Sequence, residues 1–239
     1  MGKSKYKRVL LKLSGESFCE PGGFGIDGSA LKSIAERIVE ICKLGPEAAV
    51  VVGAGNFLRG GSFSQVSGIP RNTADYMGML ATIINACALQ EMLEKSGQPT
   101  RVLSAIEVSA ICEPFIRRRA LRHLERGRVV ILAGGTGNPF FTTDTCAALR
   151  ASELEAELVI KATKVEGVYS EDPEKNRDAK LFEKLSYDDV LAKGLRIMDH
   201  SAISLCRDND IPIVVLNIFK EGNITKAICG ERVGTLISS

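Results

Sequence analysis

Histidine and tryptophan are the scarcest residues of this 239-residue chain, since tryptophan is absent and histidine occurs only twice. Such a composition leaves little material for histidine-based metal sites or proton relays. Cys-x-x-Cys pairs are also missing, although seven cysteines are scattered along the chain. An odd, unpaired set of this kind indicates reduced thiols in a cytoplasmic protein and argues against a disulfide framework or a zinc site.

The sequence also lacks a large excess of charge of one sign and a long apolar run. Lysine and arginine total 31 and aspartate and glutamate 29, so the overall charge indicates no polyanion partner. The basic stretch Arg117–Arg119, with Arg122, Arg126 and Arg128, has no interleaved aromatic residues. It predicts a solvated helix face, with an RNA-binding surface as the alternative. No apolar run approaches the roughly 20 residues of a membrane span, and the N-terminus lacks the core of a signal peptide. We therefore expect a cytoplasmic protein with neither a membrane nor a nucleic-acid partner.

Short apolar segments alternate with longer segments of helical spacing. The short segments are rich in Val, Ile and Leu and predict strands: Arg8–Ser14, Ala48–Val52, Arg101–Leu103, Val129–Ala133, Leu158–Ala162 and Ile213–Asn217. Three apolar stripes between them predict helices: Leu31, Ile34, Ile38 and Ile41; Met77, Leu80, Ile84, Cys87 and Leu93; Ala202, Leu205 and Cys206. Strand alternating with helix predicts an α/β fold, with a mostly parallel sheet covered on both faces in one domain over residues 1–239.

Three of the predicted strands end in turns that contain glycine: Leu13–Glu16, Gly53–Asn56 and Gly134–Asn138. In a parallel sheet the carboxyl ends of the strands gather at the edge where ligands bind. Glycine lets backbone N–H groups approach an anion closely, and helix N-termini behind such turns attract negative charge. Each turn taken alone is consistent with an ordinary connection, but three together favour a polyphosphate-binding site.

Two lysines are predicted at the same edge of the sheet. Lys12 ends the first strand beside Gly15, and Lys161 lies near the end of a later strand. A lysine inside an apolar strand costs free energy unless its ammonium group meets an anion or reaches solvent. Because both lysines share the edge with the glycine turns, we favour the anion, with extension into solvent as the alternative.

The common nucleotide-binding and hydrolase motifs do not fit this chain. A Rossmann fingerprint would require glycine where Leu58 stands, and Gly2-Lys3-Ser4 lacks the earlier glycine of a Walker A loop. No Gly-x-Ser-x-Gly elbow for acyl transfer occurs either.

Several collinear segments instead resemble the bacterial uridylate kinases of the amino-acid kinase superfamily, and the match covers nearly the whole chain. The segments are Lys12–Glu16, Gly53–Asn56 with Arg59–Gly60, Asp75–Thr82, Thr136–Asp144, Lys161–Val165 with Gly167, Asp172–Pro173 and Met198–Asp199. The resemblance implies an amino-acid kinase fold, a three-layer sandwich, that transfers the γ-phosphoryl group of ATP to UMP with Mg²⁺. It places UMP toward the N-terminal half and ATP toward the C-terminal half. The chain departs from the family at Ala54, where glycine is usual; a methyl group there would narrow the approach of the backbone to the UMP phosphate, and we expect the site to tolerate it.

The same resemblance implies a role for each site residue. Lys12 and Lys161 would steady the transferring phosphate, Asp144 would orient them and support Mg²⁺ through water, and Arg59 would contact phosphate oxygens. Asp199 would lie near the active site, although residue type alone makes Asp144 and Asp199 equally suitable as helix N-caps. The implied ATP-binding set is Lys12, Leu13, Ser14, Gly15, Gly55, Arg59, Thr163, Tyr169 and Asp172. The implied UMP-binding set is Ala54, Asp75, Thr136, Gly137, Asn138, Pro139, Phe140, Phe141, Thr142 and Thr143.

Regulation and assembly are further expectations from the resemblance. The family is typically hexameric, and many members are activated by GTP at a site between subunits and inhibited by UTP. Arg101 and Arg128 stand at matching places of the GTP site, but Gln90 and Glu94 replace basic residues there. We therefore predict weak or absent activation by GTP, with UTP inhibition retained.

Two alternatives remain open at this point. The first is a kinase of the same fold that acts on a carboxylate or carbamate, such as acetylglutamate, and Asp75 with the threonine-rich segment disfavours it. The second is a storage protein that binds nucleotide or oxyanions without turnover. The joint presence of Lys12, Lys161 and Asp144 disfavours this second alternative.

Overall fold

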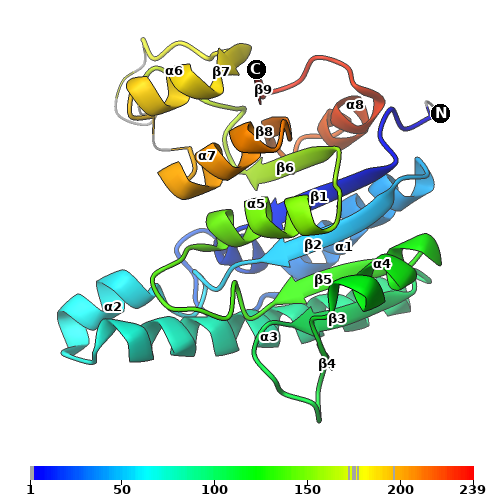
Figure 1. Cartoon of the computed structure of the whole chain (residues 1–239), viewed down its shortest axis with the longest axis vertical. Helices are drawn as coiled ribbons and strands as arrows, with labels where there is room; N and C mark the ends of the chain where they lie inside the picture. The colour runs from blue at the N-terminus through cyan, green and yellow to red at the C-terminus, as the bar shows by residue number, and fades with distance from the viewer. Residues whose placement is uncertain (1–2, 172, 174–175, 177, 196) are drawn as a thin grey trace.

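The structure, a computed structural model, describes residues 3–171, 173, 176, 178–195 and 197–239. Within these residues the chain forms one sheet of nine strands in the order β4-β3-β5-β2-β1-β6-β8-β9-β7 (Figure 1). The strands are β1 (Arg8–Leu13), β2 (Glu47–Val52), β3 (Thr100–Ser104), β4 (Glu113–Pro114), β5 (Val129–Ala133), β6 (Leu158–Thr163), β7 (Lys184–Ser186), β8 (Ile213–Asn217) and β9 (Thr235–Ser238). Each of the six predicted strands is confirmed.

The sheet is parallel except where β8 pairs with β9. All six residues of β1 are buried, as expected for a central strand that is covered on both faces. The sequence-based prediction missed β4, β7 and β9, because these short strands carry no continuous apolar run.

Helices cover both faces of the sheet and make a three-layer α/β sandwich, which confirms the predicted fold class (Figure 1). One face packs against α1 (Gly28–Lys43), α3 (Arg71–Lys95) and α8 (Asn223–Cys229). The other face packs mainly against α4 (Arg117–Glu125), α5 (Thr143–Glu153), α6 (Tyr187–Ala192) and α7 (His200–Asp208). The remaining helices are a 3-10 turn, η1 (Gly15–Phe18), and α2 (Gly60–Ser67). Alternate residues of β1 face the two layers, since Val9 and Leu11 join the first core and Leu10 joins the second.

Most of the apolar stripe expected on α3 does not face the core, so that part of the helix prediction is wrong, and only its last member, Leu93, is fully buried as predicted. Leu80 and Ile84 are exposed, and Met77 and Cys87 are only half-buried. The core is covered elsewhere by the neighbouring face of the helix, where Ala86 and Leu89 are buried together with Leu93. The stripe expected on α1 is fully buried, as predicted.

The remaining expectations from composition concern the membrane and the thiols. No helix in the described part of the chain has the length and apolar character needed to cross a membrane. All seven cysteines are free in the structure.

Candidate active site

The candidate site lies at the carboxyl ends of the central strands. From β1 the chain continues to β2 on one side of the sheet, and β6 pairs with β1 on the other side. This reversal of strand order opens a crevice in a parallel sheet, and such crevices are where α/β proteins bind ligands. The turns after β1, β2 and β5 are those in which the sequence places its glycines.

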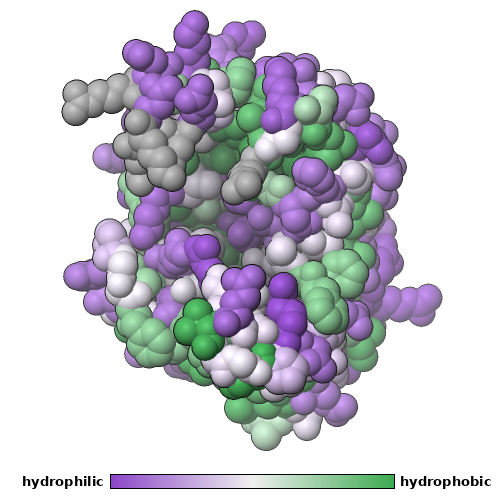
Figure 2. Space-filling model, turned by 90° about the vertical axis from the view of Figure 1, so that its left-hand side faces the viewer, coloured by the Kyte–Doolittle hydropathy of each residue, from purple (hydrophilic) through white to green (hydrophobic). Residues whose placement is uncertain are grey.

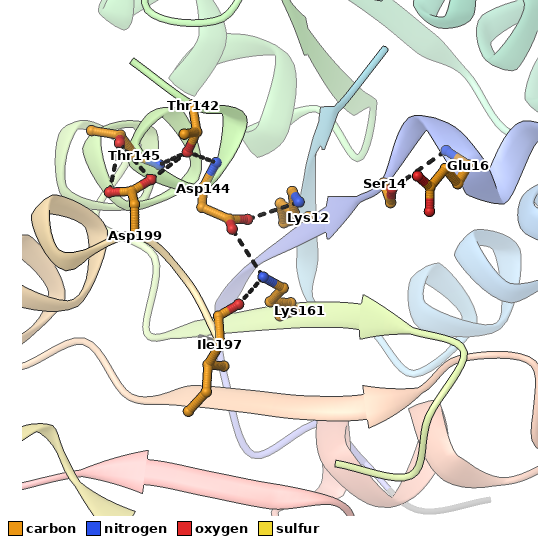
Figure 3. Close-up of polar contacts among 9 residues, drawn as sticks. All are labelled: Lys12, Ser14, Glu16, Thr142, Asp144, Thr145, Lys161, Ile197 and Asp199. Atoms are coloured by element: carbon orange, nitrogen blue, oxygen red, sulfur yellow. Dashed lines mark hydrogen bonds and ion pairs between the residues drawn. The ribbon is translucent and has the colours of Figure 1, made fainter. Parts of the chain in front are cut away.

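Two lysines and one aspartate form the centre of the site (Figure 3). Lys12 and Lys161 are register partners on the adjacent strands β1 and β6, so their side chains leave the same face of the sheet. Asp144 lies between them, with Lys12 Nζ 2.7 Å from Oδ1 and Lys161 Nζ 2.9 Å from Oδ2. Lys161 also donates a hydrogen bond to the carbonyl of Ile197. The arrangement concentrates two positive charges and one negative charge in a partly enclosed space.

The start of α5 fixes the position of Asp144. Thr142 is the N-cap, and its hydroxyl oxygen accepts hydrogen bonds from the N–H groups of Asp144 at 3.0 Å and Thr145 at 3.3 Å. Asp199 is the N-cap of α7, where it accepts from Ala202 N–H, and it also accepts from the hydroxyls of Thr142 and Thr145 (Figure 3). The N-cap interpretation is therefore confirmed for Asp199 and wrong for Asp144, whose carboxylate is left to the two lysines.

The charges in this centre shift one another's proton affinities. Burial alone would raise the pKa of Asp144, but the adjacent Lys12 and Lys161 ammonium groups outweigh it and hold the pKa below its ordinary value. Burial lowers the pKa of Lys161, and the Asp144 carboxylate only partly opposes that shift. The carboxylate is thus firmly ionised at neutral pH, and a further anion near Lys161 would stabilise the charged form of its ammonium group.

The glycine turns allow the backbone segments around this centre to approach closely. A Cβ atom on Gly15 would collide with the backbone nitrogen of Gly55, so the turns after β1 and β2 can touch only because this residue is glycine. Gly134 has φ +74°, a left-handed conformation that suits glycine.

These elements enclose a cleft of about 930 Å³, which is visible as a hollow in the surface (Figure 2). Its lining includes most of the predicted site: Lys12, Ser14, Gly15, Ala54, Gly55, Arg59, Asp75, Thr136, Phe141, Thr142, Thr143, Asp144, Lys161, Thr163 and Asp199. Other predicted residues do not line it: Leu13, Gly137, Asn138, Pro139, Phe140 and Tyr169. Leu13 is buried in the core and Tyr169 forms an isolated bridge with Leu181, while Asp172 lies outside the described residues.

Three charged residues of the cleft were missed by the sequence-based prediction: Glu16, Arg71 and Lys164. Glu16 forms an ion pair with Arg59, and both side chains are exposed at the mouth of the cleft. Arg71 pairs with Asp75 at 2.9 Å, one helical turn further along α3. The spacing of Arg71 and Asp75 by four residues was the available signal, whereas nothing in the sequence indicates that Glu16 contacts Arg59.

A magnesium ion fits the carboxylate at the centre of this cleft. Asp144 Oδ1 is buried and is in contact only with the Lys12 ammonium group, 2.7 Å away, among the described residues, so a lone pair of this oxygen remains for water or a metal ion. The described residues contain no group of three or more His, Cys, Asp or Glu side chains suited to holding a metal. Because Mg²⁺ is usually held by one or two carboxylates together with substrate phosphates and water, Asp144 alone is an adequate protein contribution.

Arg101 and Arg128 lie away from the cleft, on β3 and just before β5. Arg101 Nη1 pairs with Glu94 Oε1 at 3.0 Å, and Gln90 also contacts that carboxylate. Arg128 Nη1 lies 3.0 Å from His123 Nδ1. Each predicted effector-binding arginine thus already has a partner within the chain.

Glycine turns at the switch point of a parallel sheet, above two lysines that share one aspartate, define an α/β phosphotransferase. The chain belongs to the amino acid kinase family, which matches residues 7–217. Among solved structures it is similar to a UMP kinase from Bacillus anthracis, with 40% identity, 98% of this chain and 96% of that chain covered, and a TM-score of 0.94. It is also similar to a UMP kinase from Ureaplasma parvum, with 35% identity, both chains covered to 100% and a TM-score of 0.91. A uridylate kinase from Archaeoglobus fulgidus matches at 27% identity over 97% of this chain and 100% of that chain, with a TM-score of 0.73.

Proposed function

We propose that this protein is a uridylate kinase, which catalyses the reversible reaction of ATP and UMP to ADP and UDP in pyrimidine nucleotide biosynthesis. The observation that carries the proposal is the centre formed by Lys12, Asp144 and Lys161 at the meeting point of the glycine turns. Similarity to UMP kinases over essentially the full chain supports UMP as the acceptor.

The two substrates occupy opposite sides of the lysine centre in this proposal. Asp75 and the residues from Thr136 to Thr143 lie on the side of α3 and would bind UMP. Ser14, Gly15 and Thr163 follow β1 and β6 and would bind ATP. Tyr169 and Asp172 belong to the same proposed ATP segment. The side chain of Arg59 is exposed at the mouth of the cleft, where it pairs with Glu16. When substrate binds, it would leave Glu16 and contact phosphate oxygens instead.

Phosphoryl transfer in such a site needs positioning and positive charge more than a general base. The attacking group is a phosphate oxygen of UMP, which is largely dianionic at neutral pH because its second pKa is ~6. An acceptor that is already an oxyanion needs no proton removed before it attacks. Lys12 and Lys161 would neutralise the negative charge that spreads over the transferring group, while Asp144 keeps both ammonium groups in place. We therefore propose in-line transfer without a covalent intermediate.

Mg²⁺, when bound with ATP, would offset the negative charge of the phosphates and so reduce their mutual repulsion. Asp144 is the residue proposed to hold it, through water and the free capacity of Oδ1.

Self-association is part of the proposal. The stripe Tyr76, Leu80 and Ile84 leaves three large apolar side chains exposed along one side of α3, and contiguous exposed apolar surface marks protein–protein contacts. We propose that this stripe contributes to a homo-oligomer, a hexamer, in the cytoplasm. Ile84→Glu should reduce the mass measured by light scattering after gel filtration. An unchanged mass would exclude this stripe from the interface.

A coupled assay of ADP release with Mg-ATP and a panel of acceptors tests the function. Turnover with UMP and none with acetylglutamate is expected. Turnover with acetylglutamate would support a carboxylate kinase instead, and binding of nucleotide without turnover of any acceptor would support a storage protein.

A further inference from the structure

Two polar side chains of α3 are enclosed in the protein although the proposed reaction gives them no role. Thr82 is 2% exposed and Asn85 is fully buried. Burying a hydroxyl or an amide costs free energy unless it is hydrogen-bonded. Their hydrogen-bond partners therefore identify what these side chains hold in place.

Thr82 holds the turn that follows β5. Its hydroxyl donates a hydrogen bond to the carbonyl of Met79 at 2.6 Å, which fixes the orientation of the group. The free lone pairs of the same oxygen accept a hydrogen bond from Gly134 N–H at 2.8 Å. Gly134 opens the turn whose next residues, Gly135 and Thr136, line the cleft, and Thr82 itself also lines it.

Asn85 holds the turn that follows β2. Its Nδ2 donates hydrogen bonds to the carbonyl of Gly53 and to Asn56 Oδ1, both at 2.8 Å. Asn56 returns a hydrogen bond from its own Nδ2 to Asn85 Oδ1 at 2.9 Å. The two buried amides thus hydrogen-bond to each other in both directions, and Asn85 holds both ends of the turn, Gly53 and Asn56. Gly53, Ala54 and Gly55 within this turn line the cleft.

A third contact runs from the same helix to the same side of the cleft. Asp75 accepts a hydrogen bond from Phe140 N–H at 2.8 Å. Asp75, Thr82 and Asn85 are spaced by seven and three residues, which places all three on one face of an α-helix. α3 packs against β3 and β5 (Figure 1). Both turns are therefore attached to a helix that is itself held against the sheet.

We infer that Thr82 and Asn85 are positioning residues for the phosphate acceptor. They fix the Gly53–Asn56 and Gly134–Asn138 turns relative to each other before the acceptor arrives, so that binding does not have to order them. Among the described residues neither side chain hydrogen-bonds to Ser14, Gly15 or Thr163 of the proposed ATP side, although Gly55, in the turn held by Asn85, also belongs to the implied ATP-binding set. The inference rests on the proposed function for the identity of the acceptor, UMP.

The decisive pair of variants is Thr82→Val and Thr82→Ser. Valine keeps the shape of threonine but leaves Gly134 N–H without its acceptor, whereas serine keeps the hydroxyl. In Thr82→Val the turn is no longer held before UMP binds, so KM for UMP should rise about tenfold, the factor that corresponds to ~1.4 kcal/mol. KM for ATP should stay within about twofold of the wild-type value, and Thr82→Ser should restore KM for UMP.

Thr100→Val is the matched control, since Thr100 is also fully buried and its hydroxyl donates to the carbonyl of Gln98 at 3.0 Å, outside the cleft. This control should lower the melting temperature without changing either KM. Asn85→Leu is a second test, and it too should raise KM for UMP; because Gly55 of the same turn is in the implied ATP-binding set, only the Thr82 variants test selectivity.

The inference is overturned if Thr82→Val keeps the wild-type KM for UMP, if both KM values rise together, or if Thr82→Ser behaves like Thr82→Val. Hydrogen exchange separates this inference from the proposed function, because it needs no turnover. Gly134 N–H should exchange faster in Thr82→Val than in Thr82→Ser even if the wild-type protein failed to phosphorylate UMP. Equal exchange in the two variants would overturn the inference on its own.

Discussion

Replacing Lys161 by methionine removes one positive charge from the centre of the site while keeping most of the side-chain volume. The ammonium group lies 2.9 Å from Asp144 Oδ2 and is largely enclosed. At an effective dielectric constant near 20, two unit charges about 4 Å apart interact with ~4 kcal/mol. Because ~1.4 kcal/mol corresponds to a factor of ten in rate, loss of this ammonium group should lower kcat about 100- to 1000-fold, as observed when a single transition-state donor is removed.

The fold should survive this change. Asp144 keeps Lys12 as a partner at 2.7 Å, and the buried ammonium group of Lys161 no longer has to be desolvated. Lys12→Met should lower kcat to a similar extent, while Lys226→Met, an exposed change on α8, should leave kcat unaltered. The assay is ADP release at saturating UMP and Mg-ATP, with the melting temperature measured in parallel. A near-normal kcat in Lys161→Met would refute the placement of the active site.

Two further predictions concern pH and regulation. Asp144→Asn should be less stable than the wild type at pH 7 by ~3 kcal/mol, because it leaves two adjacent ammonium groups without a counter-ion. The pKa of Asp144 is lowered in the folded state. The difference in the free energy of unfolding between wild type and variant is therefore complete above about pH 4, the ordinary carboxyl value, and should shrink in urea unfolding as the pH falls further. A constant difference down to about pH 2 would contradict the ion-pair argument. Activation by GTP should be weak or absent, because Glu94 already pairs with Arg101 and adds a carboxylate near the proposed effector, and such repulsion is comparable to a typical coupling of ~1–3 kcal/mol. A GTP titration at subsaturating ATP measures this, strong activation at micromolar GTP would refute it, and Gln90→Arg combined with Glu94→His should restore part of the activation.

The strands that could be predicted from the sequence are those formed by a continuous apolar run. β1, β2 and β6 are covered on both faces, and apart from the terminal residues Arg8, Glu47 and Thr163 they are apolar except at Lys12 and Lys161. Helix α3 shows why periodicity alone is insufficient. Its exposed stripe of Leu80 and Ile84 is as apolar as a core-facing stripe, and the sequence does not show whether such a stripe covers its own sheet or another surface.

The site was predictable in composition but not in its contacts. Residue type and position suggested that Lys12 and Lys161 share an edge of the sheet, yet their pairing across β1 and β6 depends on strand order, which the sequence does not state. The hydrogen bonds from Thr82 and Asn85 to two distant turns could not be predicted either, because they too depend on how the strands are ordered in the sheet. A buried threonine and asparagine in a helix look like polar interruptions until their partners are known.

The preference for UMP over CMP is the most direct test of the central claim, which is that this cleft holds a uridine nucleotide as phosphate acceptor. The two acceptors differ only at the edge of the base, where a carbonyl and N–H of uracil are replaced by an amino group and a ring nitrogen of cytosine. A pocket that hydrogen-bonds one base leaves its polar groups mispaired with the other, and such mispairing is costly in an enclosed site. We expect kcat/KM with Mg-ATP to be at least ~100-fold higher for UMP than for CMP. Equal values for the two acceptors would contradict the account.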